Sequence, residues 1–349
     1  MGANCCSAAE KIPDGPGASN NQHRINNQNE ENYDENQSNR QKQKVRANIE
    51  DSQEQSDMNK DNGGQSNPHA PDQETATKID QVPEITNQAV LQTLNKLGEY
   101  NAIELPKNDD LPVLGPYRFN NKAVYIGQWK HGKRQGLGKQ YWEDGSYYHG
   151  NWENSMANGK GRLIHADGDC YEGEWKDDRA HGQGIYIHTD GAKYEGEWFE
   201  DQQHGKGTET WPDGAKYIGQ YENGKKHGEG TFVWADGATY IGQFTNNNIE
   251  GKGTYRWADN REYIGDWLNN KMHGQGTFTW PDKKKYEGQY VEDRKEGYGV
   301  FYWPDGKCYK GEWKNGRQHG EGLLINSEGK EARGVWKDGK RERWIEDNM

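Results

Sequence analysis

The chain has 349 residues, and only 30% of them are hydrophobic, which argues against a thick conventional core. The sequence contains no run of 18 apolar residues, so no transmembrane helix is predicted. The formal net charge is −12, with 10 Lys and Arg against 19 Asp and Glu in residues 1–115 and 34 against 37 in the remainder, so the chain lacks the cationic footprint that predicts a nucleic-acid partner.

The amino terminus carries a lipidation pattern. Gly2 follows Met1, as myristoylation requires, although Cys6 stands where the strict pattern has Ser or Thr and Ser7 comes one position late. Cys5 and Cys6 are candidate palmitoylation sites, and two acyl chains anchor a protein stably where one does not. We therefore predict an acylated anchor at residues 1–7; the alternative is an accidental Met-Gly start with two free thiols.

The cysteine pattern and the start of the chain indicate the compartment. Two cysteines are adjacent at the terminus, and the other two, Cys170 and Cys308, are isolated. This is neither a disulfide framework nor a zinc site, which suggests a reducing environment. No apolar segment follows Met1 that would indicate a secretory signal peptide. We expect a protein on the cytoplasmic face of a membrane, for example at the cell cortex or in a cilium, and not a secreted one.

A polar tail and one helix precede the main part of the chain. Residues 8–82 are polar and of low complexity, with too few apolar residues to offset the entropy of ordering, so we expect a disordered tail. Residues 83–114 are expected to form an amphipathic helix and a linker. The helix is predicted over 84–97, because an apolar stripe lies between Pro83 and Gly98; it consists of Val90, Leu91, Leu94 and Leu97.

From Tyr125 onward the sequence repeats every 23 residues, and such a period fixes the architecture. Each unit opens with Tyr, has Gly two residues later and an aromatic residue two further on, as in Tyr171, Gly173 and Trp175. A G-x-G pair follows, and the unit closes on a segment such as W-P-D-G. Half units flank nine complete ones, so we assign the array to residues 115–341 and a C-terminal tail to residues 342–349.

Alternation within each unit predicts two short strands. Tyr171, Gly173 and Trp175 fall on one face of a strand, and the intervening glutamates fall on the other. The Asp-Gly pair favours the positive φ of a tight turn, whereas Asn260 and Lys283 replace the turn glycine and are expected to change the turn shape. The fold class is therefore all-β: an elongated antiparallel β-hairpin solenoid in which each unit contacts only its neighbours.

The repeated aromatic residues are expected to line one face of the sheet as a trough, with the glycines as sockets for the rings. The predicted helix is too short to cover such a trough, so we expect it to cap the first units around Trp129 and Trp152 and leave the remainder to bind a protein or a second copy. The alternative is that the rings close the trough themselves. The predicted aromatic surface comprises Tyr125, Trp129, Trp152, Tyr171, Trp175, Tyr194, Trp198, Trp211, Trp234, Trp257, Trp267, Trp280, Trp303 and Trp313.

The motifs Y-x-G-x-W, H-G-x-G and W-P-D-G on a 23-residue period resemble the MORN (membrane occupation and recognition nexus) family over residues 115–341. The resemblance implies a β-hairpin solenoid that serves as a scaffold, dimerises, and recruits partners at membranes, junctions, the cytoskeletal cortex or ciliary axonemes. Some members carry a phosphoinositide kinase or methyltransferase domain, and neither is visible in this sequence.

Catalytic and metal chemistry are not predicted. The histidine column that includes His181 and His204 recurs once per hairpin pair, about 10 Å apart, which is too wide for a shared metal ion. No nucleophile elbow, P-loop or dinucleotide fingerprint is present, so we predict no enzyme activity, no metal and no cofactor. The basic triplet Lys283, Lys284 and Lys285 is a candidate contact for acidic phospholipid head groups.

The leading functional hypothesis is a non-enzymatic scaffold or adaptor tethered to a membrane by acylation, with other proteins or a second copy of the chain as partners. One alternative is a structural subunit of a ciliary axoneme or cortical cytoskeleton. Another is direct phosphoinositide binding. Nucleic acid is not expected as a partner.

Overall fold

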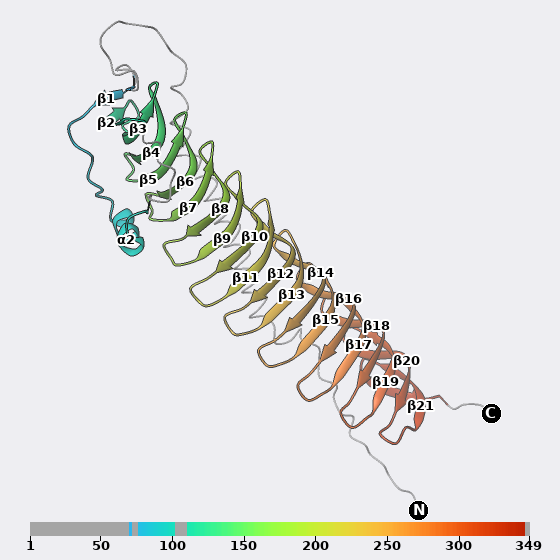
Figure 1. Cartoon of the computed structure of the whole chain (residues 1–349). Helices are drawn as coiled ribbons and strands as arrows, with labels where there is room; N and C mark the ends of the chain where they lie inside the picture. The colour runs from blue at the N-terminus through green and yellow to red at the C-terminus, as the bar shows by residue number, and fades with distance from the viewer. Residues whose placement is uncertain (1–69, 72–75, 102–109, 346–349) are drawn as a thin grey trace, which may run out of the picture. The chain divides into compact units, whose positions relative to one another are not determined.

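The computed structural model describes residues 70–71, 76–101 and 110–345, and these fall into two compact units, 70–225 and 226–345. Both units are made of antiparallel strands joined by short turns (Figure 1). The predicted all-β architecture of stacked hairpins is confirmed. Residues 1–69, 72–75, 102–109 and 346–349 lie outside the described residues.

The first unit contains one helix and eleven strands among its described residues. The helix is α2 (Gln88–Leu97). The strands are β1 (Ala76–Lys78), β2 (Val113–Phe119), β3 (Val124–Lys130), β4 (Lys133–Tyr141), β5 (Tyr147–Glu153), β6 (Met156–Ile164), β7 (Cys170–Lys176), β8 (Arg179–Ile187), β9 (Lys193–Phe199), β10 (Gln202–Thr210) and β11 (Lys216–Glu222).

The second unit continues the same alternation of long and short strands. Its strands are β12 (Lys225–Val233), β13 (Thr239–Thr245), β14 (Asn248–Arg256), β15 (Glu262–Leu268), β16 (Lys271–Thr279), β17 (Lys285–Val291), β18 (Arg294–Tyr302), β19 (Cys308–Lys314), β20 (Arg317–Ile325), β21 (Glu331–Lys337) and β22 (Lys340–Trp344). Within each unit every strand pairs antiparallel with the next strand in the sequence.

The two faces of each unit differ in the way that the alternation predicts. In β9, Tyr194 and Trp198 are 2% and 4% exposed, whereas the intervening Glu195 is exposed. We call the face that carries the Tyr, Gly and Trp columns the aromatic face, and the opposite face the second face. The second face carries the residues at the intervening positions of each strand.

Each repeat tyrosine lies over glycines of its own and the following strand. A Cβ atom on Gly207 would lie 2.5 Å from the Tyr194 ring, and one on Gly196 would lie 2.6 Å from the Gly207 Cα, so only glycine fits at both positions. The Tyr194 hydroxyl donates a hydrogen bond of 2.9 Å to the Glu197 carbonyl oxygen. The equivalent bond, from each tyrosine to the carbonyl three residues later, forms in all nine repeats, at Tyr125, Tyr148, Tyr171, Tyr194, Tyr217, Tyr240, Tyr263, Tyr286 and Tyr309.

The G-x-G pair forms a β-bulge. Between β9 and β10 the register shifts at His204 and Gly207, so that Gly205 and Lys206 have no residues opposite them. Gly205 has φ 57°, and the Lys206 amide donates to the Glu197 carboxylate at 2.8 Å. Gln243 and Asp266 accept the equivalent bond in the second unit. The side chain before the repeat aromatic residue therefore fixes the bulge.

The hairpin tips are tied to the preceding repeat. The tips are two-residue turns with positive φ at both residues, as at Glu200 and Asp201. The Asp201 side chain accepts from the Ala180 amide at 2.7 Å, and the Asp201 amide donates back to the Ala180 carbonyl at 3.0 Å. Asn247 and Asn270 make the same pair of bonds in the second unit.

The turns at Asn260 and Lys283 differ in shape from the others, as expected, since the glycines at the equivalent turn positions have φ of 82–99°. These residues have φ 66° and 67°, and both donate the turn hydrogen bond of 2.9 Å that glycine donates elsewhere. The surrounding bonds therefore hold even a lysine in the left-handed region.

The ends of the array extend beyond the predicted limits. Strand β1 lies within the stretch that was expected to be a disordered tail, and it pairs with β2 through Ala76, which is 3% exposed. At the other end, β22 continues to Trp344 instead of stopping at Arg341. Short polar edge strands of this kind give little periodic signal in the sequence.

We predict that the hydroxyl group of the repeat tyrosine contributes to the stability of the folded array. Tyr286 is fully buried and donates to the Gln289 carbonyl at 3.1 Å. Tyr286→Phe should lower the free energy of unfolding by about 0.5–1.5 kcal/mol in a urea titration, because the Gln289 carbonyl loses its donor. Tyr298→Phe, at a residue that is 61% exposed, should change it by less than about 0.5 kcal/mol. Equal effects of the two changes would contradict this role.

A second prediction concerns the buried tip carboxylate of Asp178. Burial raises its pKa from 3.8 to about 6, against the lowering effect of its bond from the Ala157 amide. The folded state thus holds the proton more tightly than the unfolded chain, and stability falls as pH rises from about 4 to about 6. Asp178→Asn keeps the acceptor oxygen and should raise stability at pH 7 by on the order of 1–3 kcal/mol, with little difference near pH 3.5. Urea titrations at both pH values test this, and a larger gain at the acid pH would contradict it.

Candidate functional site

The residues of the predicted aromatic surface do not form an open trough. Eleven of the fourteen are buried, and Trp211, Trp280 and Trp303 are half-buried. The rings pack edge to face along the array: the Trp198 ring centroid lies 5.2 Å from that of Tyr194 and 5.1 Å from that of Tyr171. The alternative, that rings packed on glycine close the trough, is the arrangement that the structure shows.

The aromatic face also buries cationic groups. Lys295 is 1% exposed, and its ammonium lies 5.0 Å from the ring centroids of both Trp280 and Trp313. Arg134 occupies the equivalent position and lies 4.4 Å from the Trp152 ring. These cation–π contacts lower the cost of burying charge.

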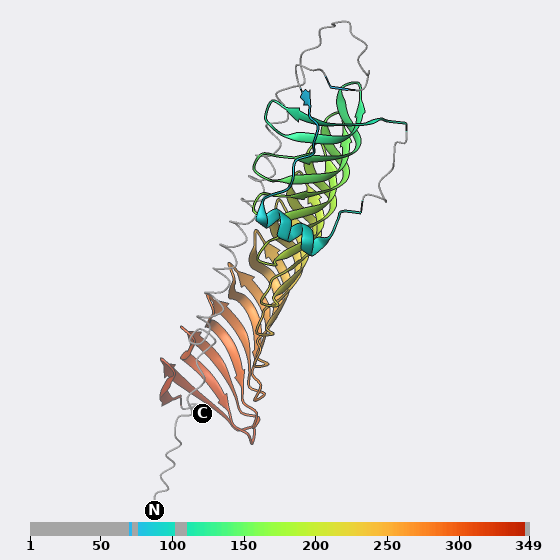
Figure 2. The same ribbon diagram turned by 90° about the vertical axis from the view of Figure 1, so that its left-hand side faces the viewer.

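Helix α2 packs on the second face, and not on the aromatic face around Trp129 and Trp152 as expected. It begins at Gln88, four residues after the predicted start, because Asn87 is the N-cap and accepts bonds from the Ala89 and Val90 amides. Gly98 ends the helix with φ 73° and donates to the Leu94 carbonyl at 2.8 Å. Figure 2 shows the helix lying across strands of the first unit.

The surface beneath the helix is apolar. Fully buried Val90 packs against Tyr147, Ile164 and Cys170, and Leu94 and Leu97 join the cluster. Cross-strand pairing brings the sheet residues together, because Ile164 lies opposite both Tyr147 and Cys170. We call these second-face residues, together with Tyr141, the α2 site.

Polar contacts fix the register of the helix on the sheet. The Thr93 hydroxyl donates to the Gly168 carbonyl at 2.7 Å, and the Asn87 amide donates to the Ala166 carbonyl at 2.8 Å. Arg162 donates to the Gly98 carbonyl at 2.7 Å and forms an ion pair with Glu172. Both ends of the helix and its middle are therefore bound to the same group of strands.

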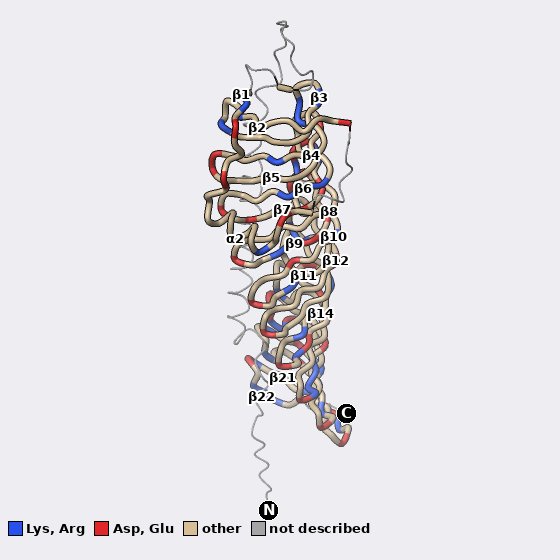
Figure 3. Tube along the Cα trace, turned by 60° about the vertical axis from the view of Figure 1, so that its left-hand side comes forward, with Lys and Arg blue, Asp and Glu red and all other residues tan. Residues whose placement is uncertain are grey.

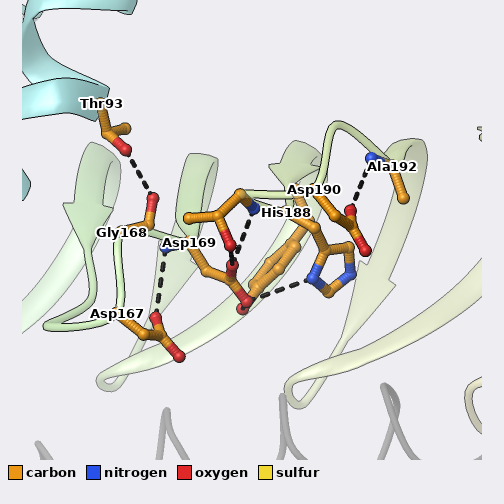
Figure 4. A network of polar contacts seen from close by, with 9 residues as sticks. Thr93, Asp167, Gly168, Asp169, His188, Asp190 and Ala192 are labelled. Atoms are coloured by element: carbon orange, nitrogen blue, oxygen red, sulfur yellow. Dashed lines mark hydrogen bonds and ion pairs between the residues drawn. The ribbon is translucent and has the colours of Figure 1, made fainter. Parts of the chain in front are cut away.

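A buried carboxylate network lies beside this contact (Figure 4). Asp169, which is 5% exposed, lies 3.1 Å from the His188 Nδ1 and accepts bonds from the Tyr186 hydroxyl at 3.2 Å and the Thr189 amide at 3.0 Å. Burial and the Asp169 charge raise the pKa of Tyr186, which stays protonated and donates to the carboxylate. The network connects the turn that receives Thr93 to the following repeat.

Sequence reasoning missed both the helix contact and this network, although the repeat period contains the signal. Asp169 stands where other repeats have an alanine, such as Ala192 and Ala215. His188 stands where the next repeat has Trp211, the tryptophan at the start of the turn. Tyr147 and Cys170 likewise stand where most later repeats have a charged residue or threonine. Departures from the consensus, at Tyr147 and Cys170 on the second face and at Asp169 and His188 beside them, locate the site.

The remaining predicted site residues are dispersed. Of the basic triplet, Lys284 and Lys285 form ion pairs of 2.8 Å with Asp282 and 2.7 Å with Glu287. Figure 3 shows Lys and Arg interspersed with Asp and Glu along both units. The lipidation residues Gly2, Cys5 and Cys6 lie outside the described residues. In the part of the chain that is described, no helix is long and apolar enough to cross a bilayer.

The MORN repeat model matches this chain nine times, over residues 125–147, 148–170, 171–193, 194–216, 217–239, 240–260, 263–285, 286–308 and 309–330. The search of curated proteins gave no match.

Among solved structures, the matches include two domains at low sequence identity. The TCP domain of Drosophila melanogaster SAS-4 (dCPAP), in complex with a proline-rich motif of Ana2 (dSTIL), is 13% identical with a TM-score of 0.29, covering 45% of this chain and 85% of that one. The TCP10 domain of Danio rerio CPAP, in complex with a STIL peptide, is 14% identical with a TM-score of 0.24, covering 60% and 94%. TM-scores this low support no inference about function.

We predict that α2 shields the thiol beneath it. Burial raises the pKa of Cys170 to about 12, which suppresses the reactive thiolate. In a Cys5→Ser, Cys6→Ser background, Val90→Asp should increase the rate of Cys170 alkylation by at least about tenfold and leave Cys308 unchanged, as measured by peptide mass spectrometry. Gln92→Asp, on the exposed side of the helix, is the matched control. Unchanged Cys170 labelling in the Val90 variant would show that the helix does not protect this face.

Proposed function

The chain belongs to the MORN repeat family, and we propose that it is a non-enzymatic scaffold that binds other proteins at a membrane to which N-terminal acylation tethers it. Members of this family are typically repeat-based binding scaffolds rather than enzymes.

The main support for a scaffold function is the way in which α2 packs on the second face of the sheet. The aromatic face is filled by its own rings, so the second face is the broad surface left for binding. On that face the first unit holds an amphipathic helix through an apolar cluster and three side-chain hydrogen bonds. A sheet that binds one helix in this manner has the chemistry to bind helices of other proteins.

The tether is supported by the coincidence of Gly2 with two adjacent cysteines at positions 5 and 6. A single myristoyl chain binds membranes only marginally, and a second acyl chain makes the attachment stable. The chain would thus reach a membrane without a cationic patch, which agrees with the ion pairs at Lys284 and Lys285.

We predict that Gly2→Ala moves the protein from the membrane fraction to the soluble fraction after detergent-free cell fractionation. Cys5→Ser with Cys6→Ser should do so partly, because the myristoyl chain remains. Ser7→Ala, at a position that accepts neither chain, is the control and should leave the distribution unchanged. Intact-mass analysis of the native protein checks the modification directly, and the absence of both acyl chains would refute the tether.

A further inference from the structure

The sheet beneath α2 is complete without the helix. Strands β5, β6 and β7 pair with one another through the same antiparallel ladders that join the strands of later repeats. The hydrogen bonds that fix α2 on these strands are made by side chains, those of Asn87, Thr93 and Arg162. Departure of the helix would therefore uncover the α2 site without breaking a strand pair.

The turn that α2 covers also exists uncovered in later repeats. A Cβ atom on Gly168 would lie 3.1 Å from the Ala89 carbonyl oxygen of α2. The equivalent glycines of four later repeats face open space, since a Cβ atom would have no atom within 4 Å at Gly214, Gly237, Gly306 or Gly329. The turn thus keeps its form without a cover, and α2 is an addition to the first unit rather than a part of the repeat.

The helix is held more weakly than the strands beneath it. It has 10 residues, fewer than the ~12–15 below which an isolated helix is marginal in water. Val90 is its fully buried residue, whereas Leu91, Leu94 and Leu97 remain partly exposed. An element with so little buried surface opens at a lower free energy than the paired strands do, so α2 can leave while the array stays folded.

The contacts of α2 define what the α2 site accepts. Its apolar positions 90, 94 and 97 pack against the buried cluster of the sheet. The Thr93 hydroxyl and the Asn87 amide donate to two turn carbonyls, and Arg162 donates to the carbonyl at the end of the helix. Because Arg162 is also paired with Glu172, the site selects a helix by its apolar spacing and polar groups and not by its charge.

We propose that α2 is an autoinhibitory segment, which occupies a binding site for an amphipathic helix of a partner protein and is displaced when that helix binds. The proposal rests on the scaffold function and adds to it a location, a ligand class and a means of control. The partner helix has about three turns, with a polar N-cap and with apolar residues spaced as Val90, Leu94 and Leu97 are. A Thr or Ser at the position equivalent to Thr93 donates to the Gly168 carbonyl.

The test uses purified full-length protein with Cys5→Ser and Cys6→Ser and a labelled peptide of residues 84–101, which carries the whole α2 pattern. Val90→Asp in the protein weakens the attachment of its own helix. In fluorescence anisotropy titrations this variant should bind the peptide at least about tenfold more tightly than the protein with an unchanged α2, because a site that its own helix occupies loses apparent affinity. Gln92→Asp, on the exposed side of α2, is the matched control and should leave the affinity unchanged.

Changes in the peptide and a footprint locate the binding. Val90→Asp in the peptide should weaken its binding to the opened protein at least about tenfold, because it places a charge in the apolar cluster. The bound peptide should slow alkylation of Cys170 and leave that of Cys308 unchanged. Should the Val90 variant of the protein fail to fold, Asn87→Ala with Thr93→Ala is a milder opening, since it removes two of the polar contacts of α2 and leaves its apolar stripe intact.

Equal affinity of the opened and unchanged proteins for the peptide would overturn the proposal, because α2 would then not control the site. So would the absence of binding to either protein, or binding that leaves Cys170 unprotected, since α2 would then be a structural part of the first unit alone. Because the titration needs no membrane and reports on the α2 site, such a result would not bear on the tether, which fractionation tests separately.

Discussion

The hydrogen bond from each repeat tyrosine to the carbonyl three residues later is the interaction on which the array depends. The bulge at G-x-G interrupts the ladder next to the residue that supplies that carbonyl. The tyrosine reaches it only by lying flat over two glycine Cα atoms, and in doing so its ring becomes one wall of the pocket for the neighbouring aromatic residue. One side chain therefore satisfies the backbone, requires the glycines, and supplies the buried apolar surface of a protein poor in aliphatic residues.

Because the aromatic face is closed by its own rings, the two faces of the sheet have different roles. The aromatic face supplies stability, since its side chains contact one another along the array and leave little surface for a ligand. The second face is free to vary, and its sequence does so: Lys193 and Lys216 occupy positions where Tyr147 and Cys170 receive a helix. Binding specificity can thus change by substitution at a few second-face positions without disturbing the fold.

The period of 23 residues was sufficient to predict the strands, the two faces and the glycine sockets, because each depends on contacts that recur in every unit. The side on which α2 packs could not be deduced in that way, since it depends on single departures such as Tyr147 and Cys170. Strand β1 was missed because three residues give no periodicity, and the bulge contact of Glu197 was missed because the bulge itself does not appear as alternation. The altered turn at Lys283 was predictable because lysine lacks the conformational freedom of glycine, while the bonds that enclose the turn keep it in the left-handed region.

The reciprocal bonds at the hairpin tips bear on how an array of this kind changes in length over evolutionary time. Each tip, as at Asn270, bonds to the backbone of the preceding repeat and offers its own backbone to the next. Duplication or loss of one whole 23-residue repeat keeps each hydrogen-bond donor opposite its acceptor. A shift of a single residue would move the donors away from their acceptors and exchange the two faces of the sheet. The gene is therefore free to lengthen or shorten in whole repeats, and a binding site confined to a few strands can be carried along the array as a unit.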